Sequence, residues 1–136
     1  MTLFTDEQMK GTGQLDMVAL INQNEAIKAK LRTLPHHFYA DPSHGWLKVR
    51  FNHLKALGIL GAITGFSYRT GDDVYLEEDY DANLYINALF GKYGERSPEQ
   101  VQAFEDWRAK VNDHHSNRDS FVRGLPMFHK RESKTL

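Results

Sequence analysis

The sequence contains no cysteine, which excludes a disulfide framework, a thiolate zinc site, an iron–sulfur cluster and a cysteine nucleophile. It also lacks any apolar run approaching the roughly 18 residues that a membrane-spanning helix needs. Residues 1–10 have neither the basic start nor the apolar stretch of a secretion signal. We therefore expect a cytoplasmic protein with no membrane partner.

Neither sign of charge is in excess, because 17 Lys and Arg residues face 18 Asp and Glu residues. This balance argues against a protein that binds nucleic acid with its whole surface and against a strongly acidic mimic of DNA. The 136 residues, 40% of them apolar, are enough to fill one core without covalent cross-links. We expect a single α+β domain over residues 14–128, between a flexible arm (1–13) and a basic C-terminal tail (129–136).

Helical spacing of apolar residues predicts about four helices. The longest begins near Gln14 and ends before Pro35. A short helix over 50–57 precedes a glycine in the position of a left-handed C-terminal cap, and a third helix covers 82–90. A fourth begins at Ser97, where an N-cap, a first-turn proline and a third-position glutamine follow one another.

Two hairpins are predicted to form a small antiparallel sheet that packs against these helices. The first joins strands at 36–41 and 46–49 through a turn in which Asp41 and Ser43 bond to the backbone and Gly45 takes a left-handed conformation. Its turn residues are Asp41, Ser43, His44, Gly45 and the buried Trp46.

The second hairpin joins residues 63–69 to 74–77 through a turn at 70–73. Tyr75 and Leu76 are expected in the core because alternation gives each strand one apolar face. The polar segment 112–117 is predicted to be a turn.

Charge is unevenly distributed along this near-neutral chain. Residues 72–81 include six acids and no base, whereas residues 108–136 include seven Lys or Arg and three Asp or Glu. Opposite local charges suit steering toward a protein partner or toward another copy of the chain. The predicted partner-binding residues are Asp72, Asp73, Glu77, Glu78, Asp79, Asp81, Arg118 and Arg123.

An alternative is a metal-dependent hydrolase or nuclease that uses Glu77, Asp79 or Asp81 together with His37 or His44. The spacing of the histidines does not favour a metal site, because neighbours on a strand point to opposite faces. Acids before a helix are also explained by capping and by the helix dipole. With no Gly-rich phosphate loop and no nucleophile elbow, we assign no catalytic residue, metal or cofactor.

A second alternative is nucleic-acid binding through the basic C-terminal segment, in which Arg118, Arg123, Lys130 and Arg131 surround Phe121 and Phe128. No RNA-binding sheet motif or helix-turn-helix accompanies these residues. A partly ordered, solvated terminus explains the same composition.

Two motifs, D-P-S-H-G-W at 41–46 and Y-L-E-E-D-Y-D-A at 75–82, occur together in this chain. The pairing resembles a family of short, uncharacterised proteins of bacteriophages and mobile elements, and the match covers residues 38–82. This resemblance implies a host or phage component as partner, including a defence system, and the host cytoplasm as location. Our leading prediction is therefore a small, non-enzymatic binding protein.

Overall fold

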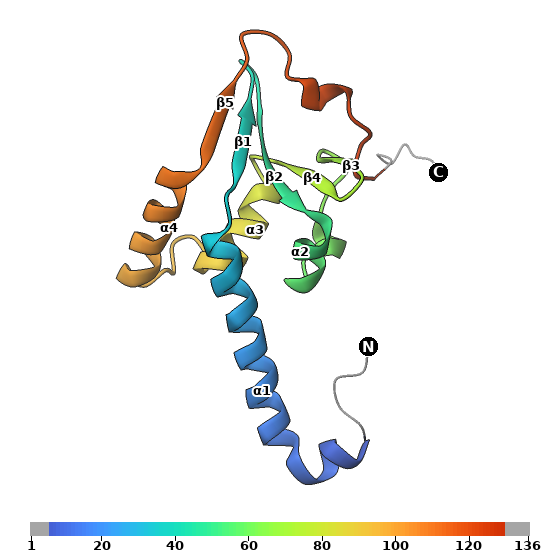
Figure 1. Ribbon diagram of the computed structural model, residues 1–136, viewed down its shortest axis with the longest axis vertical. Helices are drawn as coiled ribbons and strands as arrows, with labels where there is room; N and C mark the ends of the chain where they lie inside the picture. Colours follow the sequence, from blue (N-terminus) through green and yellow to red (C-terminus); the bar gives the residue numbers. More distant parts are fainter. Residues whose placement is uncertain (1–5, 130–136) are drawn as a thin grey trace.

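The computed structural model describes the backbone of residues 6–129 and the side chains of residues 17–19 and 21–129 (Figure 1). The α-helices are α1 (Asp6–Thr33), α2 (Phe51–Ala56), α3 (Asp81–Phe90) and α4 (Pro98–Lys110). The strands are β1 (His37–Ala40), β2 (Gly45–Arg50), β3 (Tyr68–Thr70), β4 (Asp73–Glu77) and β5 (Asn112–His115). Two 3-10 helices, η1 (Leu60–Ala62) and η2 (Phe121–Gly124), complete the order.

One sheet of five strands in the order β3-β4-β2-β1-β5 confirms the predicted α+β class. The β1–β2 and β3–β4 hairpins are both present and antiparallel, and β2 joins them by pairing with β4. The sheet is mixed, since β5 pairs with β1 in parallel. The predicted turn over 112–117 is therefore wrong for residues 112–115, which are all exposed and lack the apolar alternation of a half-buried strand.

The two faces of the sheet pack against different parts of the chain. Leu47, Val49, Val74 and Leu76 face the helices and share the main core with Tyr85, Leu89, Phe90 and Trp107. Trp46 and Tyr75 point the other way and pack around Val122. Burial of Trp46, Tyr75 and Leu76 confirms the sequence prediction.

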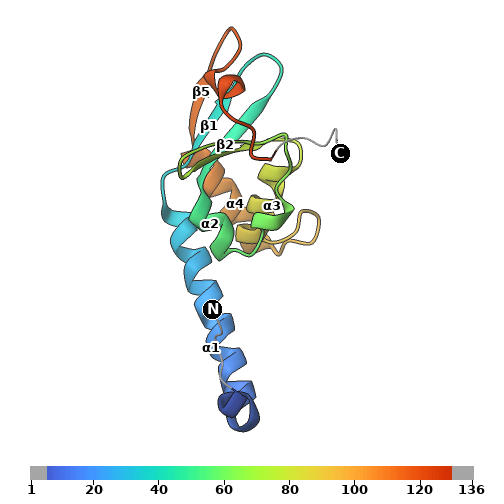
Figure 2. The ribbon, with the colours of Figure 1, turned by 90° about the vertical axis from the view of Figure 1, so that its right-hand side faces the viewer.

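Helix α1 projects from the body, as two perpendicular views show (Figures 1 and 2). Among its described side chains, those of Ile27 and Leu31, near its C-terminal end, reach the core. It ends at Thr33, before Pro35 as predicted, but it begins at Asp6 and so includes much of the segment predicted as an arm. Residues 1–5 and 130–136 lie outside the described residues. No helix in the described part combines the length and apolar character needed to cross a membrane.

Candidate functional site: a cleft with aromatic and acidic walls

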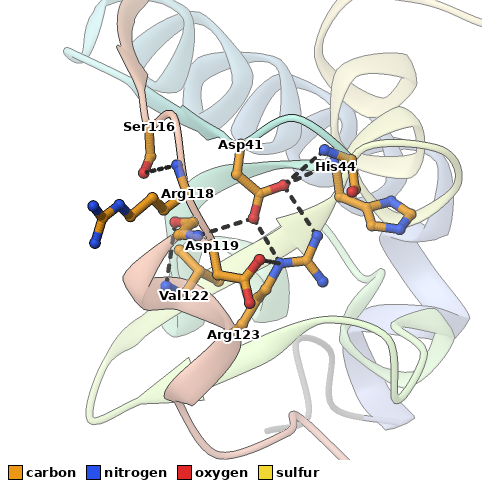
Figure 3. Close-up of polar contacts among 9 residues, drawn as sticks. Asp41, His44, Ser116, Arg118, Asp119, Val122 and Arg123 are labelled. Atoms are coloured by element: carbon orange, nitrogen blue, oxygen red, sulfur yellow. Dashed lines mark hydrogen bonds and ion pairs between the residues drawn. The ribbon is translucent and has the colours of Figure 1, made fainter.

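The turn between β1 and β2 is organised by the carboxylate of Asp41, whose side chain is 1% exposed (Figure 3). It accepts hydrogen bonds from the backbone N–H groups of Ser43, His44 and Ser120 at 2.9 to 3.0 Å. Arg123 adds two more, from Nε at 2.6 Å and from Nη2 at 3.0 Å. The Arg123 guanidinium holds the pKa of this carboxyl far below its usual range. Asp41 therefore fixes the turn as predicted, whereas Ser43 contributes its backbone N–H.

Residues 116–128, here called the cover segment, lie over the sheet face that carries Trp46. Arg123 places its guanidinium 5.2 Å from the centre of the Trp46 ring. The segment then follows β3, where the Arg69 N–H donates to the Pro126 carbonyl at 2.8 Å. The ion pair with Asp41 and this backbone bond hold the second half of the cover segment in place, so the cavity beside it has a fixed wall.

That cavity, here called the cleft, has a volume of about 450 Å³. Its lining residues come from the β1–β2 turn, β2, the approach to β3, the end of β4 and the cover segment: His44, Trp46, Phe66, Tyr68, Glu77, Asp79 and Arg123. Three of these residues are aromatic and two are acidic. Because Trp46 and Glu77 are direct partners in the β2–β4 register, the sheet itself sets an aromatic wall beside an acidic one.

The two acidic side chains lie close to His44. A ring nitrogen of His44 and carboxylate oxygens of Glu77 and Asp79 all lie within 4.8 Å of one another. The Glu77 carboxylate accepts hydrogen bonds from the backbone N–H groups of Asp79 at 2.9 Å and Tyr80 at 3.2 Å. Partial burial and the neighbouring carboxyl of Asp79 raise the pKa of Glu77. Within residues 17–129, no Lys or Arg forms an ion pair with either acid.

Trp46 lines the cleft, but its indole nitrogen is inaccessible to solvent. The residue is 2% exposed, and its indole N–H has no hydrogen-bond acceptor among the described residues. A buried donor without an acceptor costs about 1–3 kcal/mol.

Behind the cleft, Asp81 is fully buried and belongs to the framework. Its Oδ2 accepts hydrogen bonds from the N–H and hydroxyl of Thr64 and from the hydroxyl of Ser67. Ser67 in turn accepts the backbone N–H of Glu77 at 2.9 Å. Asp81 therefore positions Glu77 through Ser67, and we correct its assignment to an exposed partner-binding surface.

The other predicted acidic residues lie in separate places. Asp72 and Asp73, at the β3–β4 turn, form ion pairs with Arg50, and Asp73 also pairs with Lys48. Glu78 faces the helical side, where its carboxylate borders a smaller cavity beside α3. Only Glu77 and Asp79 of the predicted acidic set line the cleft.

Gly45 does not have the left-handed conformation that was predicted, since the positive-φ residues of the described chain are other glycines. A Cβ atom at Gly45 would lie 2.3 Å from the Phe38 ring and 2.8 Å from the Glu78 carboxylate. Glycine is required here because side chains crowd the backbone.

His36 and His37, just before and at the start of β1, serve elsewhere. His36 is buried, with Nε2 at 2.7 Å from the Tyr85 hydroxyl and Nδ1 at 3.2 Å from the Trp107 indole nitrogen. His37 Nδ1 lies 3.0 Å from His114 Nε2 on the sheet. Of the histidines considered with the acids, His44 is thus the one that joins the cleft.

The residues of the predicted basic surface do not form one patch in the described part of the chain. Arg123 is committed to Asp41, whereas Arg118 is exposed on the cover segment. Phe121 packs edge-on against Tyr39 and Tyr75. Lys130 and Arg131 lie outside the described residues.

Sequence reasoning missed Phe66, Tyr68 and Ser67 as residues of the site. Their only signal was membership of a predicted β-hairpin strand rich in aromatic residues. A comparison of the chain with protein-family models gives no match, and comparisons with curated proteins and with solved structures give none either. The cleft therefore carries the functional inference.

Proposed function

We propose that this chain is a small binding protein whose cleft receives a positively charged side chain of a protein partner. One observation carries the proposal: among the described residues, the carboxylates of Glu77 and Asp79 form no ion pair with a Lys or Arg, and they stand beside aromatic walls. Arg123 lines the same cavity, but its charge is matched by two hydrogen bonds to Asp41. The cleft therefore keeps an excess of negative charge.

The chemistry of the walls suits an arginine or lysine side chain. Carboxylates form charge-assisted hydrogen bonds with such a group, and the rings of Phe66 and Tyr68 can attract it through cation–π interactions. A protein partner fits this cleft better than a nucleic acid, whose phosphates the two carboxylates would repel.

The resemblance to phage and mobile-element proteins supports a partner of host or phage origin. The motif D-P-S-H-G-W supplies Asp41, His44 and Trp46, and the motif Y-L-E-E-D-Y-D-A supplies Glu77, Asp79 and Asp81. These residues build the cleft or the framework that holds it. The two motifs are thus separate in the sequence and joined in one site.

Isothermal titration with short acetylated peptides tests this function. Peptides that carry arginine or lysine should bind, and matched peptides with citrulline or norleucine should bind about tenfold more weakly or not at all. Glu77→Gln and Asp79→Asn should each weaken binding to a similar extent, and added salt should weaken it further. Asp72→Asn is the matched control, because Asp72 pairs with Arg50 away from the cleft.

Equal binding of charged and neutral peptides, or binding that survives both cleft substitutions, would contradict the proposal. Absence of binding across a peptide set that varies the residues flanking the charge would also contradict it.

A further inference from the structure

We infer that the cleft is also a binding site for a divalent transition-metal ion, with His44, Glu77 and Asp79 as its three protein ligands. The site shares two carboxylates with the proposed partner-binding function, but it also needs the imidazole of His44. A basic side chain does not need that imidazole. The two properties can therefore be separated in one protein.

The three side chains are close enough to serve one ion. Ligand atoms bound to a common ion at about 2.1 Å lie about 3 to 4 Å from one another. The candidate atoms of His44, Glu77 and Asp79 already lie within 4.8 Å of one another. His44 and Asp79 are exposed, so small rotations of their side chains can close the remaining distance. Glu77 is half-buried and anchored by backbone N–H groups, and it gives the site a fixed point.

Electrostatics favour a cation at this position. The carboxylates of Glu77 and Asp79 lie close together, and two neighbouring carboxylates repel each other when both are ionised. A divalent ion converts the repulsion into attraction for both groups. Arg123 cannot do so in its present position, because its donors Nε and Nη2 bond to Asp41.

The cleft also has room for the rest of a coordination shell. Three protein ligands leave coordination positions for water on a metal ion. The cleft that the three side chains line has a volume of about 450 Å³, which is ample for such water molecules.

The ligand set indicates the kind of ion. One imidazole nitrogen and two carboxylate oxygens suit Zn²⁺ or Mn²⁺, whereas Mg²⁺ and Ca²⁺ prefer oxygen ligands throughout. Because the ion and a basic side chain use the same carboxylates, we expect their binding to be mutually exclusive.

Titration of the chelator-treated protein with Zn²⁺ alone, and separately with Mn²⁺ alone, tests the site by calorimetry and thermal melting. One ion should bind per cleft and raise the melting temperature. His44→Ala, Glu77→Gln and Asp79→Asn should each weaken binding by about tenfold or more. His115→Ala is the control, since His115 is exposed on β5 and lies outside the cleft.

Peptide titrations of the parent protein, in a chelator and then with one equivalent of Zn²⁺, distinguish this inference from the proposed function. Arginine peptides should bind in the chelator and be displaced by the ion. The ring of His44 makes no hydrogen bond to Asp41, which uses the backbone N–H of His44, so the turn should survive His44→Ala while the metal ion is lost. Circular dichroism spectra that match the parent would show that the fold is intact.

The outcomes separate clearly. Metal affinity unchanged in His44→Ala and Asp79→Asn, or no binding of either ion by the parent, would overturn the metal site and leave the peptide result standing. Metal binding without peptide binding would support the site and contradict the proposed function.

Discussion

Arg123 holds Asp41 through two hydrogen bonds, although 82 residues separate them in the sequence. The pair ties the cover segment to the turn of the first hairpin and so fixes one wall of the cleft. The Asp41 side chain is nearly inaccessible to water, whereas the Arg123 side chain is partly exposed. The carboxylate therefore needs the guanidinium as its hydrogen-bond partner, while the guanidinium can also be solvated by water.

Removing the partner of a buried charge should be costly. We expect Arg123→Met to lower the free energy of unfolding more than the loss of an exposed ion pair does, because it leaves the inaccessible Asp41 carboxylate without its guanidinium. Urea unfolding measures the change. Arg108→Met, which breaks the exposed Arg108–Asp113 pair, should cost less than about 1 kcal/mol. If the two variants lost the same free energy of unfolding, the Arg123–Asp41 pair would contribute no more to stability than an exposed ion pair.

The same pair predicts acid sensitivity. The pKa of Asp41 is lowered in the folded protein, so its contribution to stability is complete above the unfolded value near 4 and declines as the pH falls below it. Asp41→Asn should flatten the decline in stability between about pH 4 and pH 2. If the unfolding free energies of the parent and the variant declined in parallel as the pH fell, Asp41 would not be the source of the acid sensitivity.

Gly45 should resist even a small substitution. We expect Gly45→Ala to destabilise the fold by about 1–3 kcal/mol, since the new Cβ would overlap the Phe38 ring. Phe38→Leu in the same chain should recover part of the loss by making room. Gly61→Ala serves as the control because nothing lies within 4 Å of its Cβ position and its φ is not positive. Thermal melting of the four proteins distinguishes crowding from a general intolerance of alanine.

His36 should make the fold less stable in mild acid. Burial lowers its pKa, so the unfolded chain binds a proton more readily than the folded one as the pH falls below about 6.5. Stability should therefore fall between about pH 6.5 and pH 5. His36→Gln should remove the part of the pH dependence of the unfolding free energy that comes from His36. The part that comes from His53, whose pKa is also lowered, should remain. Urea titrations at several pH values provide the test, and an unchanged slope in His36→Gln would refute it.

Ser67 connects the framework to the cleft. Ser67→Ala removes the donor to Asp81 and the acceptor of the Glu77 N–H, and it should cost about 2 kcal/mol or more. Ser43→Ala should change stability by less than about 0.5 kcal/mol, because Ser43 is exposed and contributes its backbone N–H. If the two variants unfolded at the same urea concentration, Ser67 would have no bridging role.

Features determined by neighbouring residues could be predicted from the sequence. Ser97 and Gln100 form the predicted capping box, with hydrogen bonds in both directions. Both hairpins and the glycine after α2 follow from turn chemistry within a few residues. These signals come from residues close together in the sequence, so the packing of distant segments does not change them.

Features determined by distant pairing could not be predicted in this way. The sequence suggested Glu77, Asp79 and Asp81 as equivalent acids and His37 and His44 as equivalent imidazoles. The register of β2 on β4 places Trp46 opposite Glu77, whereas the first turn of α3 takes Asp81 into the interior. Strand β5 carries no apolar pattern, because an exposed edge strand is specified by its backbone bonds to β1.

The parallel ladder between β1 and β5 also constrains the order in which the protein can fold. A nascent chain can close both hairpins early, but one edge of β1 has no neighbour until the residues after α4 leave the ribosome. Bringing those residues back requires closure of a long loop, which is slower than forming local contacts. Completion of the sheet and docking of the segment that walls the binding site thus come late in folding, and the site matures only when the cover segment arrives.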